Sequence, residues 1–105
     1  MQINGVDFEF DIYDLDQSEA FDQALDKLSD EEQIIKAALD SQKATEMNKA
    51  VIGMFQKFFI NATGVDVLAE CRNANAAALA YDEFLLRISK QKSVLATKYD
   101  VKRVR

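Results

Sequence analysis

The chain opens with a strict alternation of apolar and acidic residues over positions 6–12. A period of two places alternate side chains on opposite faces of a β-strand. The preceding Asn4-Gly5 pair is typical of a two-residue type I′ turn, in which both turn residues need positive φ. The pattern therefore predicts a β-hairpin over residues 1–13. Its expected cross-strand pairs are Ile3 with Val6, Gln2 with Asp7 and Met1 with Phe8.

Such a hairpin is too short to be stable in water on its own. Its apolar face, formed by Val6, Phe8, Phe10 and Ile12, must therefore be covered. Two arrangements satisfy this need. Either the helices of the same chain pack on this face, or the second strand offers a free edge to another chain.

Residues 17–43 follow a helical period, and Asp16 or Ser18 is the expected N-cap. Ser29 begins a Ser-x-x-Glu spacing that is typical of a capping box, which allows two helices here. The seven-residue step from Leu28 to Ile35 stays in phase and favours one helix, straight or kinked near residue 29, over two. The stripe consists of Phe21, Ala24, Leu25, Leu28, Ile35, Ala38 and Leu39.

Residues 46–60 form a second predicted helix, which Thr45 is expected to cap and Gly64 to terminate with positive φ. Its apolar arc spans roughly 160°, whereas an ordinary surface helix shows about 100°. This helix must therefore be covered on two sides. Gly53 leaves room for the close approach of another backbone, at a cost of about 1 kcal/mol of helix propensity relative to alanine. The arc consists of Met47, Val51, Ile52, Met54, Phe55, Phe58 and Phe59.

A short helix is expected over residues 66–71, with Asp66 as its cap, and a long alanine-rich helix over residues 75–99, started by Asn73 or Asn75. A basic tail follows over residues 100–105. The chain contains no proline and no linker that would divide it. We expect a single domain of residues 1–105 that is mainly α, with three to four helices in a small bundle and a short N-terminal β-hairpin.

The charges are distributed unevenly along the chain. Residues 1–50 carry thirteen acidic and four basic side chains, and residues 51–105 carry five acidic and nine basic ones, for a net charge of −5. This gradient is either ordinary solvation or the sign of a bipolar protomer that associates head to tail with its copies. The basic residues at 102–105 are a small footprint for nucleic acid, which is not an expected partner.

The residues needed for catalysis are scarce. The chain has no histidine, which is the usual general base and metal ligand. Its one cysteine, Cys71, cannot form an internal disulfide, which favours a reducing cytosol, and it has no histidine to activate it. The acidic groups at 11–16 and 30–32 lack the central glycine of a calcium loop. We therefore expect a protein that is not an enzyme and has no catalytic residue, metal or cofactor.

The first fourteen residues, Met-x-Ile-Asn-Gly-Val-x-Phe-x-Phe-Asp-Ile-Tyr-Asp, carry a family resemblance. Together with the Glu19-Ala20-Phe21 and Ala24-Leu25 steps of the next helix, they resemble the start of a family of small phage and prophage proteins of Gram-positive hosts, similar to tail assembly chaperones. The resemblance is strongest over residues 1–28. It is looser around Phe55-x-x-Phe58-Phe59 and the Gly64 turn.

This resemblance implies a helical protein of the host cytoplasm that self-associates or holds an aggregation-prone tail component, typically the long helical tape-measure protein. The expected partners are this or another tail protein and further copies of the chain, with no membrane. Two alternatives remain open: a structural tail or connector component of the virion, and a small helical adaptor or regulatory protein. The wide apolar face of helix 46–60 suits a partner helix, although the central helix of a bundle would show the same face. The candidate partner-binding residues are Ile52, Phe55, Phe59, Phe8 and Phe10.

Overall fold

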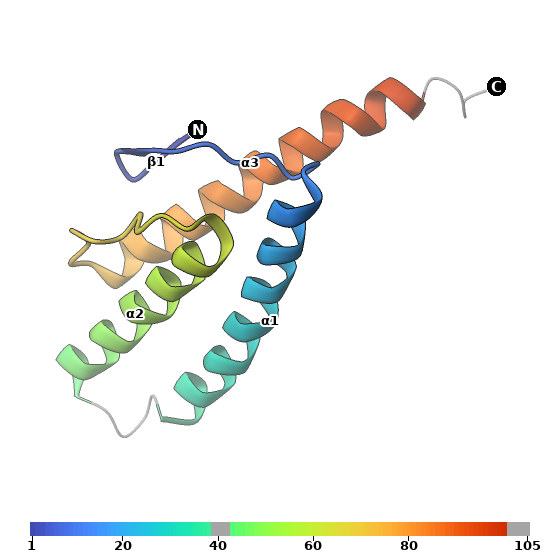
Figure 1. Cartoon of the computed structure of the whole chain (residues 1–105). Coiled ribbons are helices and arrows are strands. Elements are labelled where there is room, and N and C mark those ends of the chain that lie inside the picture. The colour runs from blue at the N-terminus through green and yellow to red at the C-terminus, as the bar shows by residue number, and fades with distance from the viewer. Residues whose placement is uncertain (39–42, 101–105) are drawn as a thin grey trace.

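The computed structural model describes residues 1–38 and 43–100 (Figure 1). Two short antiparallel strands come first, and three helices follow. The predicted fold class, a mainly helical chain with an N-terminal β-hairpin, is confirmed. The elements are β1 (Gln2–Ile3), β2 (Val6–Asp7), α1 (Leu15–Ala38), α2 (Ala44–Thr63) and α3 (Ala74–Asp100).

The hairpin has the predicted register, with Gln2 opposite Asp7 and Ile3 opposite Val6. Beyond these pairs, the Phe8 amide donates to the Met1 carbonyl over 2.9 Å. Both turn residues have positive φ, 53° at Asn4 and 78° at Gly5, as a type I′ turn requires. Strand pairing ends here, well short of the predicted residue 13.

The ends of α1 differ from the prediction. The helix begins at Leu15. The Asp14 carboxylate accepts a hydrogen bond from the backbone N–H of Gln17 at 3.0 Å, so Asp14 is the N-cap. The expectation of Asp16 or Ser18 as the N-cap is wrong. The helix then runs through Ser29 as one helix, and the alternative of two helices is wrong. It ends at Ala38, and the predicted extension over residues 39–42 lies outside the described residues.

The second helix is longer than predicted. It begins at Ala44, with Lys43 at the N-cap position and no side-chain capping bond, so Thr45 lies within the first turn and is not the cap. The expected C-terminal glycine is confirmed. Gly64 has φ 75°, and its N–H donates to the Ile60 carbonyl at 2.9 Å.

The short helix predicted over residues 66–71 is absent, and the chain makes a turn there instead. Val67 and Leu68 are each 1% exposed, so this segment serves to place two apolar side chains in the core. The Asp66 carboxylate does not cap a helix; it accepts both hydrogen bonds from the Gln56 amide. Asn73 starts α3 by accepting the Ala76 N–H at 3.0 Å.

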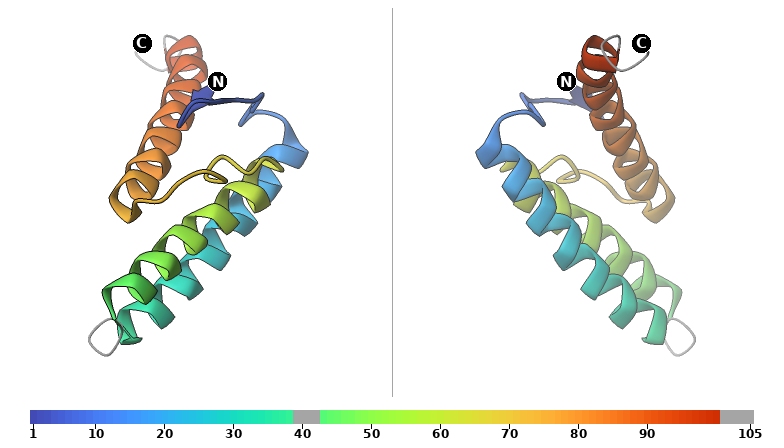
Figure 2. Two further views of the ribbon diagram at one scale, coloured as in Figure 1. Left: turned by 90° about the vertical axis from the view of Figure 1, so that its left-hand side faces the viewer. Right: turned by 90° about the vertical axis from the view of Figure 1, so that its right-hand side faces the viewer.

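The last helix therefore begins one residue before the predicted 75–99 range and extends through Asp100. Residues 101–105, most of the predicted basic tail, lie outside the described residues. The helices α1 and α2 lie antiparallel and side by side, and α3 packs across α2 (Figures 1 and 2). The C-terminal part of α3 projects beyond the hairpin, in keeping with extents of 57 × 28 × 22 Å.

The core is built around the fully buried ring of Phe84 in α3. Five other phenylalanine rings have their centroids 5.2 to 6.2 Å from it. The segment after the hairpin, α1 and α2 each supply at least one of these rings. The face of the hairpin strand is thus covered by the chain's own helices, the first of the two arrangements considered above. The five rings belong to Phe8, Phe10, Phe21, Phe58 and Phe59.

One glutamine side chain attaches the segment that follows β2 to α3. The Gln91 amide donates to the Phe10 carbonyl at 2.9 Å and accepts the Ile12 N–H at 3.0 Å. The Tyr13 hydroxyl donates to the backbone carbonyl of the same glutamine. Gln91 thus supplies to this segment the donor and the acceptor that a neighbouring strand would otherwise provide.

Replacing Phe84 with alanine is expected to lower the free energy of unfolding by about 3 to 5 kcal/mol, because it leaves a cavity that five rings line. Urea unfolding followed by circular dichroism measures this change. Ser89→Ala, on the exposed side of the same helix, is the control and should change stability by less than about 0.5 kcal/mol. A small effect of Phe84→Ala would contradict the central place of this ring.

Gln91→Ala is expected to lower the free energy of unfolding by about 1 kcal/mol, because the Phe10 carbonyl and the Ile12 N–H both lose their partner. The same unfolding measurement applies, with the exposed neighbour Lys92→Ala as the control. Equal stabilities of the two variants would show that the glutamine amide does not hold the segment.

Candidate functional site

The structure places four of the five candidate partner-binding residues inside the core. Phe8, Phe10, Phe55 and Phe59 are buried, and Phe59 is fully so. Ile52 is half-buried. The aromatic residues chosen from the sequence thus have a structural role in this fold, and their contact with a partner stays a prediction.

Burial along α2 changes abruptly at its middle. All of its buried residues lie from Met54 onward, whereas Met47, Val51 and Ile52 in the first half are half-buried. The second half receives α3, as the 5.0 Å separation of the Phe55 and Tyr81 rings shows. Among the described residues, the expected cover on two sides is therefore present only over the second half of α2.

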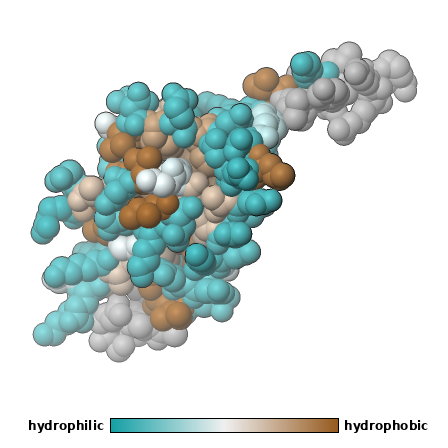
Figure 3. All heavy atoms as spheres, in the orientation of Figure 1, coloured by the Kyte–Doolittle hydropathy of each residue, from teal (hydrophilic) through white to brown (hydrophobic). Residues whose placement is uncertain are grey.

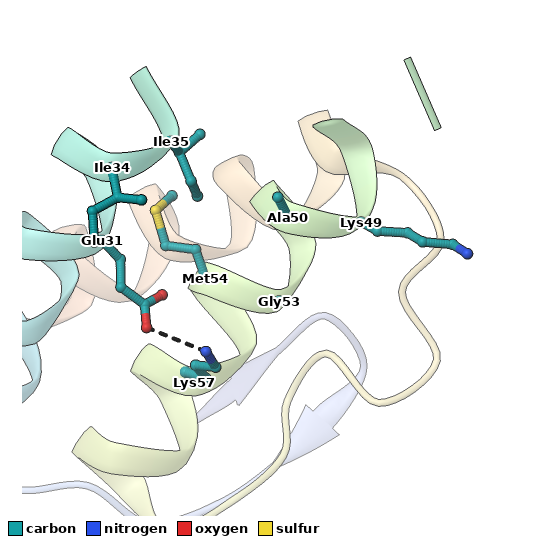
Figure 4. A pocket seen from close by; sticks show the side chains of 8 residues that line it. All are labelled: Glu31, Ile34, Ile35, Lys49, Ala50, Gly53, Met54 and Lys57. Atoms are coloured by element: carbon teal, nitrogen blue, oxygen red, sulfur yellow. Dashed lines mark hydrogen bonds and ion pairs between the residues drawn. The ribbon is translucent and has the colours of Figure 1, made fainter. Parts of the chain in front are cut away.

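An apolar groove lies between α1 and α2 toward the end that is remote from the β-hairpin (Figure 4). Its volume is about 410 Å³. Ile34 of α1 is 69% exposed beside it, and the Met54 side chain of α2 reaches across toward α1. The groove is lined by Glu31, Ile34, Ile35, Lys49, Ala50, Gly53, Met54 and Lys57.

Sequence reasoning assigned Ile35 to the core stripe of α1 and did not use Ile34. The overlooked signal was an isoleucine adjacent to the stripe, on the side of the helix where polar residues are expected. Figure 3 shows separate apolar patches on a largely polar surface. One of these patches lies near the end of the α1–α2 pair that is remote from the hairpin.

The rim of the groove is charged. The Lys57 ammonium lies 3.3 Å from the Glu31 carboxylate, and this exposed pair links the two helices across the groove. Such a pair contributes little to stability. The Lys49 side chain points away from this ion pair (Figure 4). With two lysines and one glutamate, the rim carries a net positive charge.

Gly53 lies at the edge of this groove and also lines a second hollow of about 300 Å³ on the other side of α2, beside Ile52 and Cys71. Apart from the adjacent backbone of α2 itself, a Cβ atom built on Gly53 meets no heavy atom of the described residues within 4 Å. The close approach of another backbone, which the sequence led us to expect, is therefore not made by this chain over residues 1–38 and 43–100.

Potential ligands for metal ions are dispersed. Over the described part of the chain, no three cysteine, aspartate or glutamate side chains gather as a metal site would require. Cys71 is half-buried, and its Sγ lies 3.3 Å from the Asn73 carbonyl oxygen. Within the same residues, no helix is long and apolar enough to cross a membrane.

The surroundings of Tyr81 in α3 oppose its ionisation. Burial raises its pKa above 10.0, and the carboxylates of Glu32 and Asp82 raise it further. The phenol ring packs at a tilt against Phe55 and edge to face against Phe58, with ring centroids 5.0 Å away in both cases. The neutral phenol is thus the form that fits the junction of the three helices.

Because the pKa of Tyr81 is higher in the folded state than the value of 10.0 in the unfolded chain, its contribution to stability is complete below pH 10.0 and is lost as pH rises through the folded pKa. We expect the free energy of unfolding to fall as pH rises above 10.0, and Tyr81→Phe to make this fall less steep. Urea unfolding at a series of alkaline pH values measures the free energy of unfolding of both proteins. An unchanged slope in the variant would contradict this assignment.

Comparison with curated proteins and with solved structures finds no match for the chain. A family model matches residues 4–103, from the turn of the hairpin through α3. The match covers nearly the whole chain, and the protein therefore belongs to this family, which is described as a family of unknown function (DUF6673).

Proposed function

We propose that this chain is a non-enzymatic binding protein of phage tail assembly, which holds an amphipathic helical segment of a tail component such as the tape-measure protein. The resemblance of residues 1–28 to tail assembly chaperone-like proteins suggests the setting. The groove between α1 and α2 is the observation that carries the binding role.

The groove suits a helix as its occupant. Ile34 of α1 offers exposed apolar surface, and the buried Met54 of α2 lines the groove beside it with an unbranched side chain that adapts its shape. Gly53 beside them leaves the surface of α2 flat, so that a partner backbone can approach closely. An amphipathic helix lays its apolar side chains into such a groove.

The net positive charge of the rim favours a partner segment with acidic residues beside its apolar face. The absence of histidine from the whole chain supports a role without catalysis. In this proposal, the protein works before the tail is complete and leaves the particle. The structural alternative instead places it in the finished virion.

The proposal is tested by co-expressing the chain with the tape-measure protein of a phage of a Gram-positive host and measuring co-purification. Ile34→Asp should abolish the complex, because it introduces a charge into the apolar groove. Ile60→Asp is the control, since Ile60 is also an exposed isoleucine but lies outside the groove.

Three results separate the alternatives. Failure of the unaltered chain to bind the tape-measure protein would overturn the tail-assembly role. Equal loss of co-purification in Ile34→Asp and Ile60→Asp would show that the groove is not the binding site. Detection of the chain in purified virions by mass spectrometry would favour the structural component.

Gly53→Ala is expected to raise the free energy of unfolding by up to about 1 kcal/mol, because alanine is the better helix former and its Cβ has room. The same change should weaken the complex with the tape-measure protein, since the added methyl group lies where the partner backbone approaches. Thermal unfolding and co-purification measure the two effects. A variant that is more stable and binds equally well would show that the glycine is not part of the binding surface.

A further inference from the structure

The long helix α3 exposes apolar side chains on the side that faces away from the core. Leu79 is 59% exposed, Leu86 55% and Val94 73%. At 100° per residue, these three positions fall within about 80° of one another around the helix. The buried positions Ala77, Ala80, Phe84 and Ile88 form a separate face, centred roughly 120° away around the helix.

No other described element covers this outer face. Both panels of Figure 2 show one long side of α3 without neighbouring ribbon. The hairpin borders this face at one end, where Asn4 lines a hollow with Leu79 and Glu83. The exposed face extends over residues 79–94, which is about 22 Å of helix. It is separate from the groove between α1 and α2.

Two opposite charges complete the pattern. Along the outer face, the order is Leu79, Glu83, Leu86, Lys90 and Val94. The apolar and charged positions are thus arranged almost symmetrically about Leu86, with the acidic residue on one side and the basic residue on the other. Glu83 and Lys90 are both exposed.

This order makes the face complementary to itself in the antiparallel direction. If a second copy of α3 lies alongside with Leu86 against Leu86, then Leu79 meets Val94 of the second copy. Glu83 then meets Lys90 of the second copy. In a parallel pair, glutamate would face glutamate and lysine would face lysine, and like charges oppose association.

We propose that the outer face of α3 is a self-association surface, through which two copies of this chain pair antiparallel about a two-fold axis at Leu86. The arrangement is isologous, since the same surface is used by both copies. It differs from the head-to-tail association that the charge gradient of the sequence suggested. It does not depend on the tail-assembly role, and it leaves the groove free for a partner.

The ion pair of Glu83 with Arg87 in the same helix is compatible with this arrangement. The two side chains lie 3.3 Å apart and are 45% and 41% exposed, so the pair contributes little and Glu83 can also reach a second copy. A single pair of helices over this length buries a small area, and such interfaces belong to the weak and exchangeable class. The dimer should therefore form in a concentration-dependent manner.

The first experiment is sedimentation velocity of the full chain over a wide range of concentrations. The unaltered chain should shift from monomer to dimer, and Leu86→Glu should weaken the dimer by about tenfold or more. Ile60→Glu, which changes an exposed isoleucine of α2, should leave it unchanged. Because Leu86 is exposed, the variant should keep its circular dichroism spectrum. A monomer at every concentration, or a dimer that tolerates Leu86→Glu, would overturn the proposal.

The second experiment tests the direction of the helices by disulfide cross-linking in a Cys71→Ser background. A mixture of Leu79→Cys and Val94→Cys chains should cross-link under oxidation, because these positions meet in the antiparallel pair. Neither variant should cross-link efficiently alone. Efficient cross-linking of each variant with itself would indicate a parallel pair and would contradict the proposed symmetry.

Charge reversal gives an independent measure. Glu83→Lys and Lys90→Glu should each weaken the dimer, because each places like charges opposite one another. The double variant should restore association, since lysine and glutamate have then exchanged places. Failure of the double variant to recover the dimer would show that these two residues do not face each other.

Discussion

The structure depends on the burial of one aromatic side chain, Phe84. Rings from the hairpin exit, α1 and α2 all converge on it, so this one side chain of α3 touches every layer of the fold. A hairpin with two residues in each strand would be unstable alone. Here the rings that follow it, and the Gln91 amide that holds the same segment, tie it to the longest helix. Local strand geometry persists because the tertiary core supports it.

The position of this core also determines which surfaces remain open. The aromatic rings gather where α3 crosses the second half of α2, so the first half is packed against α1 without a third layer from the described elements. The groove beside Met54 is a consequence of that geometry. On α3 itself, turning Phe84 and Ile88 inward sends Leu86 outward. Both candidate surfaces thus follow from the placement of a single core.

Much of the fold could be predicted because its signals are local. The Asn4-Gly5 turn, its register and the Gly64 C-cap depend on backbone conformations that few residues adopt, and all three are confirmed. Helix ends were less predictable, since Asp14, Asp16 and Ser18 are all good N-caps and the choice depends on how the chain enters the helix. The turn at Val67 and Leu68 resembles a helix in sequence but is drawn into the core.

The candidate sites show the same division. The sequence by itself determined the spacing of the apolar residues, and therefore the side of each helix that they occupy. Only the tertiary structure decided that Phe55 and Phe59 are buried while Ile34 is exposed, because burial depends on which segments meet, and these are far apart in the chain. Periodicity is a property of each helix, whereas exposure is a property of the assembled fold.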